Sequence, residues 1–239
     1  MEEHQPAGGT LEGTAGSPGG EDALADPRAL QILTTEHWSL LSARSLAYNE
    51  AFSRAGMFLT FLSASLIVMG FLLASDSFRP VVIPVIAILL SVDLFVGAAT
   101  LGRLVGASVE ELHAVRGMNR IRHAYRDMVP GLEPYFVSGF HDDARGVLAF
   151  YGAAPMDRSM LRNVAHGVTT TIGMVGTTLA FIFGALVGVL TIAAKVDTGL
   201  AIPFGVVASI VAFITIALAG QRAALRNQTR ASARFPTPD

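Results

Sequence analysis

The stretch Thr169–Ala194 reads TTTIGMVGTTLAFIFGALVGVLTIAA and contains no charged side chain. Three more apolar stretches accompany it, at Met57–Ser75, Pro80–Gly102 and Leu200–Ala219. An α-helix rises about 1.5 Å per residue and the hydrocarbon core of a bilayer is about 30 Å thick, so roughly 20 such residues cross it. The sequence therefore predicts an all-α, polytopic membrane protein with four transmembrane helices.

The composition of the whole chain agrees with this class. Its 239 residues are 51% hydrophobic and 15% charged, with a mean hydropathy of +0.50. The net charge is −2 and the basic residues are dispersed, which argues against nucleic-acid binding. The chain has no cysteine, so disulfides and thiolate metal sites are excluded. The amino terminus is acidic and lacks an apolar core, so we expect the first membrane helix, rather than a signal peptide, to direct insertion.

The distribution of basic residues predicts the orientation of the spans. Arginines cluster before the first span, between the second and third spans, and after the fourth, whereas the two short connectors hold only Arg79 and Lys195. Cytoplasmic loops carry an excess of Lys and Arg, so both termini and the central segment are expected in the cytoplasm.

The spans then form two hairpins, with a small helical region on the cytoplasmic side. Asp26 and Pro27 are typical of a helix start, as N-cap and first helical residue. The predicted organisation is a disordered acidic tail (1–25), an amphipathic cytoplasmic helix (26–56), a transmembrane hairpin (57–106), a cytoplasmic helical segment (107–166), a second transmembrane hairpin (167–220) and a basic C-terminal tail (221–239).

Apolar residues at helical spacing continue outside the spans and predict a small cytoplasmic bundle. The second span is expected to extend to about Met128, a short helix is expected at Ala144–Tyr151 with Asp143 as its N-cap, and another is expected to start at Asp157. The predicted buried faces are Leu30, Leu33, His37, Leu41, Tyr48 and Phe52 on the first helix, and Ala114, Val115, Met118, Ile121 and Tyr125 on the extended second one.

Asp93 is the only charged residue within the four apolar stretches, and Ser91 and Thr100 are its nearest polar neighbours in sequence. A carboxylate near the bilayer centre costs about 2.5–3.5 kcal/mol on insertion scales, so Asp93 is expected to face the bundle or a wet cavity. Two interpretations remain open. Asp93 is either a proton- or cation-handling group or a neutral acid hydrogen-bonded to a Ser or Thr of a neighbouring helix.

Small residues in the third span predict close helix packing. Gly184 and Gly188 form a GxxxG pattern, which lets two helix backbones approach and gain dispersion contacts in lipid. Packing within the chain and packing between copies would both satisfy the pattern, and packing within the chain is favoured.

Two basic sets are candidate binding surfaces. The first could bind an anionic headgroup or a nucleotide phosphate, although a solvated helix face is favoured because interleaved acids make the central segment nearly neutral. The second repeats every four residues and would form a juxtamembrane helical stripe, each member adding about 1 kcal/mol of attraction to an anionic leaflet. The first set is His113, Arg116, Arg120 and His123, and the second is Arg222, Arg226, Arg230 and Arg234.

Signatures of catalysis are missing from the sequence. It has no Gly-x-Ser-x-Gly, no GxxxxGK[ST], no GxGxxG and no His-Glu-x-x-His. Glu110 and His113 have the spacing of a di-iron ligand pair, but the chain has no second Glu-x-x-His. We therefore expect no catalytic residue, metal or cofactor.

Several polar runs outside the spans resemble an actinobacterial family of small four-span integral membrane proteins. These runs are Glu36-His37-Trp38, Asn49-Glu50 and Arg116-Gly117-Met118-Asn119-Arg120-Ile121-Arg122. The resemblance covers roughly Leu30–Ala219 and implies a location in the plasma membrane. It carries no functional residue across, but it favours a working surface on the cytoplasmic side.

The resulting expectation is a non-enzymatic plasma-membrane protein whose cytoplasmic helices contact a protein partner or anionic lipid. The membrane lipids of the inner leaflet and either a membrane-protein partner or a homo-oligomer are its expected partners. The alternative is a channel- or transporter-like protein that uses Asp93.

Overall fold

The structure is a computed structural model that describes residues 23–74, 79–151, 169–230 and 232–238. Four of its helices are long and apolar enough to cross a membrane, which confirms the predicted all-α, multi-pass class. Asp157 lies outside the described residues. The helices are α2 (Ala29–Ala74), α3 (Arg79–Met128), α4 (Ala144–Phe150), α6 (Thr171–Ala193) and α7 (Thr198–Arg230), with a short 3-10 helix η2 (Glu133–Tyr135).

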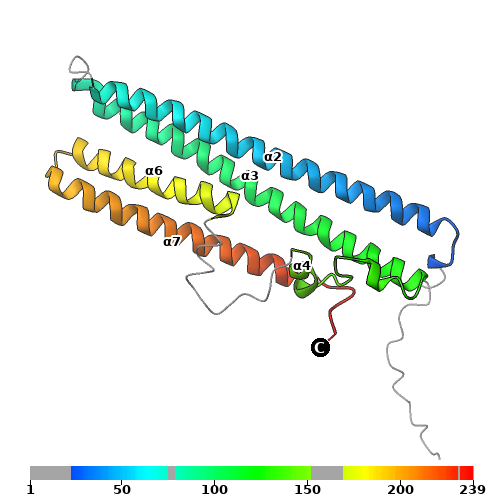
Figure 1. The fold of residues 1–239 in the computed structure, drawn as a ribbon. Coiled ribbons are helices and arrows are strands. Elements are labelled where there is room, and N and C mark those ends of the chain that lie inside the picture. Colours follow the sequence, from blue (N-terminus) through cyan, green and yellow to red (C-terminus); the bar gives the residue numbers. More distant parts are fainter. Residues whose placement is uncertain (1–22, 75–78, 152–168, 231, 239) are drawn as a thin grey trace, which may run out of the picture.

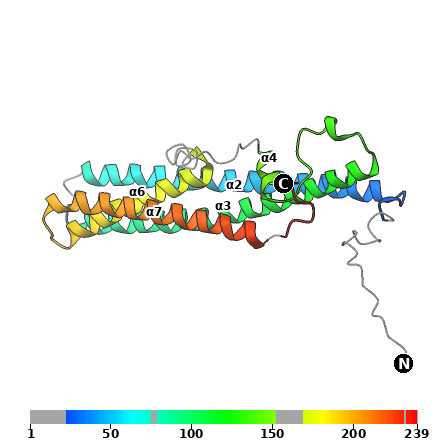
Figure 2. The same ribbon diagram turned by 90° about the horizontal axis from the view of Figure 1, so that it is seen from below.

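The four long helices form two antiparallel hairpins, α2–α3 and α6–α7, joined mainly by contacts between α3 and α6 (Figure 1). Helix α2 has 46 residues and α3 has 50, so each is about 70 Å long, more than twice the thickness of a hydrocarbon core. Both must therefore project beyond the bilayer. Figures 1 and 2 show them continuing as a pair past the beginning of α6. We call this pair, residues 29–56 and 107–128, the stalk.

Buried and half-buried positions on α2 recur mostly at spacings of three or four residues, as in a coiled coil. Ala47 and Ala55 are buried on this line, and Ala51 is half-buried. Leu33 and His37 lie on the line as predicted, but the rest of the predicted face is wrong. The 3.5-residue line drifts away from a 3.6-residue hydrophobic face, and small alanines carry no strong apolar signal. The exposed members of the predicted face are Leu30, Leu41, Tyr48 and Phe52.

The predictions for α3 and α4 are confirmed. Helix α3 ends at Met128, and Asp143 caps α4 by accepting a hydrogen bond from the Gly146 amide at 2.9 Å. A small core joins α2, α3 and α4 at the stalk, as expected for a bundle outside the membrane. Its members are Val115, Met118 and Val147, with Leu40, Leu112 and Phe150 packed against them.

The glycines of α6 explain the second hairpin. A Cβ atom on Gly184 would collide with the side chain of Ser209 and the carbonyl oxygen of Gly205, both on α7. A Cβ atom on Gly188 would lie 3.4 Å from the carbonyl oxygen of Ala201. The GxxxG pattern therefore packs α6 against α7 within the chain, which confirms the favoured interpretation.

Candidate functional site

Asn119 organises the end of the stalk. Its side chain is fully buried on α3, and its Nδ2 donates to the carbonyl oxygens of His141 at 2.8 Å and Gly146 at 3.4 Å. Its Oδ1 accepts a hydrogen bond from the guanidinium of Arg122 at 2.8 Å. One amide side chain thus holds both the loop before α4 and α4 itself against α3.

Asp142 lies in that loop and binds a segment from the far end of the chain. Its carboxylate has no exposed surface and accepts from the Arg120 Nε at 2.6 Å, the Arg234 amide at 3.0 Å and the Phe235 amide at 2.8 Å. The Asp142 amide in turn donates to the Phe235 carbonyl oxygen at 3.2 Å. These bonds hold residues 232–238, here called the C-terminal segment, against the loop.

Three further contacts fasten the same segment. Arg120 donates to the carbonyl oxygen of Ser232 at 3.3 Å, and the Thr237 hydroxyl donates to Asp143 Oδ1 at 2.8 Å. The Phe235 ring stacks on the His123 ring, with centroids 4.0 Å apart and planes 22° apart. Exposure alternates along the segment, with residues 233, 235 and 237 half-buried and their neighbours exposed, and the chain bends at Arg234 and Phe235, where both amides turn toward Asp142.

The hydrogen bonds keep both carboxylates of the loop ionised at neutral pH. Burial by itself raises the pKa of Asp142, but the bonds from Arg234, Phe235 and Arg120 outweigh it and hold the pKa below its ordinary value. Burial also raises the pKa of Asp143, and the bonds from Gly146 and Thr237 again lower it overall. The segment therefore docks on two negative charges.

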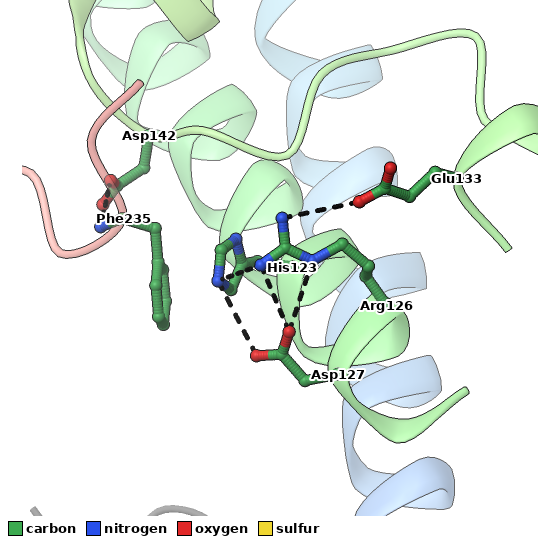
Figure 3. A network of polar contacts seen from close by, with 6 residues as sticks. All are labelled: His123, Arg126, Asp127, Glu133, Asp142 and Phe235. Atoms are coloured by element: carbon green, nitrogen blue, oxygen red, sulfur yellow. Dashed lines mark hydrogen bonds and ion pairs between the residues drawn. The ribbon is translucent and has the colours of Figure 1, made fainter. Parts of the chain in front are cut away.

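His123 belongs to a second polar cluster beside this one (Figure 3). Its Nε2 lies 2.9 Å from the Arg126 guanidinium and 3.6 Å from Asp127, and Arg126 also approaches Glu133 at 3.6 Å. Burial, and then the positive charge of Arg126, lower the pKa of His123 below its ordinary value, against the opposing effect of Asp127. The ring facing Phe235 is therefore neutral at pH 7.

Cation–π contacts brace α4 on its other side. The guanidinium groups of Arg44 and Arg122 lie 5.0 Å and 5.5 Å from the centroid of the Phe150 ring, and Arg44 also pairs with Glu111 at 3.0 Å. Burial and the neighbouring Glu111 carboxylate raise the pKa of Tyr151 to about 12. Helix α4 is thus joined to α2 through Arg44 and to α3 through Arg122.

The structure divides the predicted basic face of α3. Arg120 and His123 both join the site around Asp142 and Phe235, but His113 is exposed and Arg116 is half-buried with its Nε lacking a hydrogen-bond partner in the described part of the chain. The guanidinium of Arg120 is already engaged with Asp142. The four residues therefore do not converge on one anion site.

The predicted stripe of arginines is wrong in its last member. Helix α7 ends at Arg230, so Arg234 lies beyond the helix in the C-terminal segment, where Asp142 holds its backbone amide. Arg222 is exposed on α7, and the side chains of Arg226 and Arg230 lie outside what the structure describes. Arg234 instead lies in a bend, where its amide and that of Phe235 both donate to Asp142.

Asp93 is buried in the transmembrane region with a partner from the neighbouring helix. The Ser65 hydroxyl on α2 donates to Asp93 Oδ1 at 2.9 Å, and Asp93 has no exposed surface. Its Oδ2 lacks a hydrogen-bond partner among the described residues. The hydroxyls of Ser91 and Thr100 instead donate to carbonyl oxygens of their own helix, at 2.7 Å and 2.8 Å.

Sequence reasoning did not single out Asn119, Asp142 or Phe235 as site residues. The available signals were a buried-face position with an amide side chain, two successive aspartates directly before a short helix, and an aromatic–proline pair near the C-terminal end. Within residues 23–74, 79–151, 169–230 and 232–238, no group of three His, Asp or Glu residues is placed to hold a metal ion. Comparison with protein-family models, curated proteins and solved structures found no match, so the chemistry of the site itself must carry the functional argument.

Proposed function

We propose that this protein is a non-catalytic integral protein of the plasma membrane that presents its stalk to a protein partner in the cytoplasm. The two transmembrane hairpins anchor the stalk, and the network around Asn119 and Asp142 gives its end a defined shape. A buried carboxylate is tolerated only with a full set of donors, so this network favours one arrangement of the loop and the C-terminal segment.

One observation carries the proposal. Helices α2 and α3 are longer than is needed to cross a bilayer, and the region outside the spans leaves large apolar side chains exposed. Ile32 and Trp38 on α2 are exposed, and so are Tyr135 and Val137 in the connection between α3 and α4. Exposed apolar surface within the spans faces lipid, but outside them it is typical of a protein interface.

The arginine distribution supports the proposed orientation, with the stalk and both termini in the cytoplasm. Arg222 is exposed near the end of the apolar part of α7, and this exposure supports the proposal that it contacts anionic headgroups of the inner leaflet. In this proposal lipid contact anchors the protein, and partner binding is its function.

A transporter-like role for Asp93 is the rival. The bond from Ser65 supports a structural role instead, because it joins α2 to α3 in the way expected of a neutral acid held by a neighbouring hydroxyl. Flux of protons or cations in proteoliposomes that disappears in Asp93→Asn would favour the rival over our proposal.

The test is purification of the full chain from native membranes in mild detergent. We expect a stoichiometric protein partner, which should be lost when Ile32 and Trp38 are both changed to Ser. Val196→Ser is the matched control, because Val196 is an exposed apolar residue in the connector at the opposite end of the bundle. Recovery of a lone, lipid-poor monomer of the unaltered chain would contradict the proposal.

A further inference from the structure

The C-terminal segment is held largely through its backbone. Asp142 accepts from two successive backbone amides and donates its own amide to the Phe235 carbonyl oxygen, while Arg120 donates to the Ser232 carbonyl oxygen. Every amino acid except proline supplies the same amide donor, and every one supplies the carbonyl acceptor. These four bonds therefore recognise the backbone of a bent chain without selecting its sequence.

Two side chains of the segment add selectivity. Phe235 stacks on His123, and the Thr237 hydroxyl donates to Asp143. Pro236 and Pro238 follow these two residues, and each fixes its own φ angle, so less conformational entropy is lost when the segment docks. An aromatic residue followed by proline is thus the pattern that this surface reads.

We propose that the surface formed by Arg120, His123, Asp142 and Asp143 is a peptide-binding site for an aromatic–proline segment of the partner protein that bends as residues 232–238 do, with residues 232–238 acting as a competitor from the same chain. This assignment rests on the proposed function, since it names the chemistry by which the stalk recognises its partner.

The docked segment has the properties of a ligand that can be displaced. Its outward residues, Ser232, Arg234, Pro236 and Pro238, are exposed, and Phe235 is only half-buried. When the segment leaves, the Asp142 carboxylate retains Arg120 and gains access to water, so the charge is not stranded. Release therefore requires no change in the helices.

Residues 232–238 belong to the same chain as the binding surface, and this connection sets how strongly a partner segment must bind in order to displace them. A short linker keeps a segment near its site at an effective concentration on the order of millimolar. A partner segment with the same contacts therefore binds the unaltered chain only weakly, and one with additional contacts to the exposed stalk binds well. The competitor thereby makes recognition depend on both surfaces.

The experiment uses the full chain in detergent and a fluorescent synthetic peptide with the sequence SARFPTP, which corresponds to residues 232–238. The receptor is the Phe235→Ala variant, in which residues 232–238 bind more weakly while the four residues of the binding surface are unchanged. We expect saturable binding at least tenfold tighter to Phe235→Ala than to the unaltered chain. Replacing Phe by Ala in the peptide should weaken binding about tenfold, because the stack on His123 is lost.

A second substitution tests the binding surface itself. Adding Asp142→Asn to Phe235→Ala should weaken peptide binding at least tenfold. Adding Glu133→Gln should not, since Glu133 is a neighbouring acid that pairs with Arg126 rather than with the segment. Circular dichroism of each variant checks that the helices remain folded.

Three results would overturn the proposal. These are equal affinity for the unaltered chain and Phe235→Ala, peptide binding that survives Asp142→Asn in a folded variant, and no binding at millimolar peptide. A dimer of the unaltered chain that dissociates in Phe235→Ala would assign the segment to a second copy and would also refute it. Failure of peptide binding while a partner still co-purifies would leave the proposed function standing, with the partner on the exposed stalk face alone.

Discussion

Replacing Asp142 by Asn should release the C-terminal segment without unfolding the helices. Asp142 accepts three hydrogen bonds from N–H donors, two from the segment and one from Arg120. Asn keeps one acceptor oxygen and turns the other into an amide nitrogen, which must face one of those donors. The substitution also removes the negative charge that strengthens the remaining bonds.

The magnitude follows from those three bonds. A hydrogen bond to a charged group contributes about 1.5–3 kcal/mol, so the loss of one bond and the weakening of two others should reduce the docking free energy by about 2–3 kcal/mol. Because about 1.4 kcal/mol corresponds to a factor of ten, the undocked population should rise roughly 30- to 150-fold.

Hydrogen–deuterium exchange of the full chain measures this population. The amides of Arg234 and Phe235 donate to Asp142, so their exchange should accelerate by the same factor in Asp142→Asn, while amides in the middle of α3 keep their protection. Glu133→Gln serves as the control and should leave the segment protected. Unchanged protection at Arg234 and Phe235 in Asp142→Asn would refute our account of docking, and so would equal acceleration throughout α3.

The pH dependence of this contribution has a definite sign. The pKa of Asp142 in the docked state lies below its ordinary value, because the hydrogen bonds outweigh the effect of burial. The Asp142 contribution is therefore fully present above the ordinary pKa of about 3.9, and it is lost as pH falls through the docked value. Exchange corrected for intrinsic rates should show no change in this contribution between pH 5 and pH 8.

Three other measurements test the remaining structural assignments. Gly184→Ala should lower the melting temperature in detergent, because its Cβ would collide with α7 and overpacking costs about 1–3 kcal/mol. Gly102→Ala should not, since nothing lies within 4 Å of a Cβ atom at that position. Equal melting temperatures of the two variants would contradict the packing of α6 on α7. The imidazole of His123 should titrate below its ordinary pKa of about 6.5 by NMR, and its pKa should rise toward that value in Phe235→Ala. The contribution of His123 to docking is therefore present above pH 6.5 and is lost as pH falls through the docked pKa. Asp93→Asn should melt within a few degrees of the unaltered chain, because an amide oxygen still accepts from the neighbouring serine, and a large loss of stability would show that the charge is required.

Features that depend on local chemistry were predictable from the sequence. The four spans follow from uninterrupted apolar composition, since lipid leaves a helix no polar partner outside itself. Met128 ends α3 just before Pro130, which disfavours the helical conformation in the residue before it. Asp143 caps α4 with a bond to an amide only three residues away. In each case the deciding atoms lie within a few residues of one another.

The line of contact along α2 was only partly predictable. Hydrophobicity identified Leu33 and His37 but passed over the buried Ala47, because alanine is not strongly apolar. Its burial depends on the presence of α3 opposite, and Gly117 of α3 makes room for Leu40. The sequence of one helix does not show the shape of the helix that packs against it.

By itself the amino-acid sequence determined the all-α class, the four apolar helices, the extension of α3 to Met128 and the cap of α4, because each rests on interactions between near neighbours. Only the tertiary structure decided that Ser65 is the partner of Asp93 and that Asp142 holds Phe235. A carboxylate accepts from any donor within reach, and which donor comes within reach depends on how distant parts of the chain pack together.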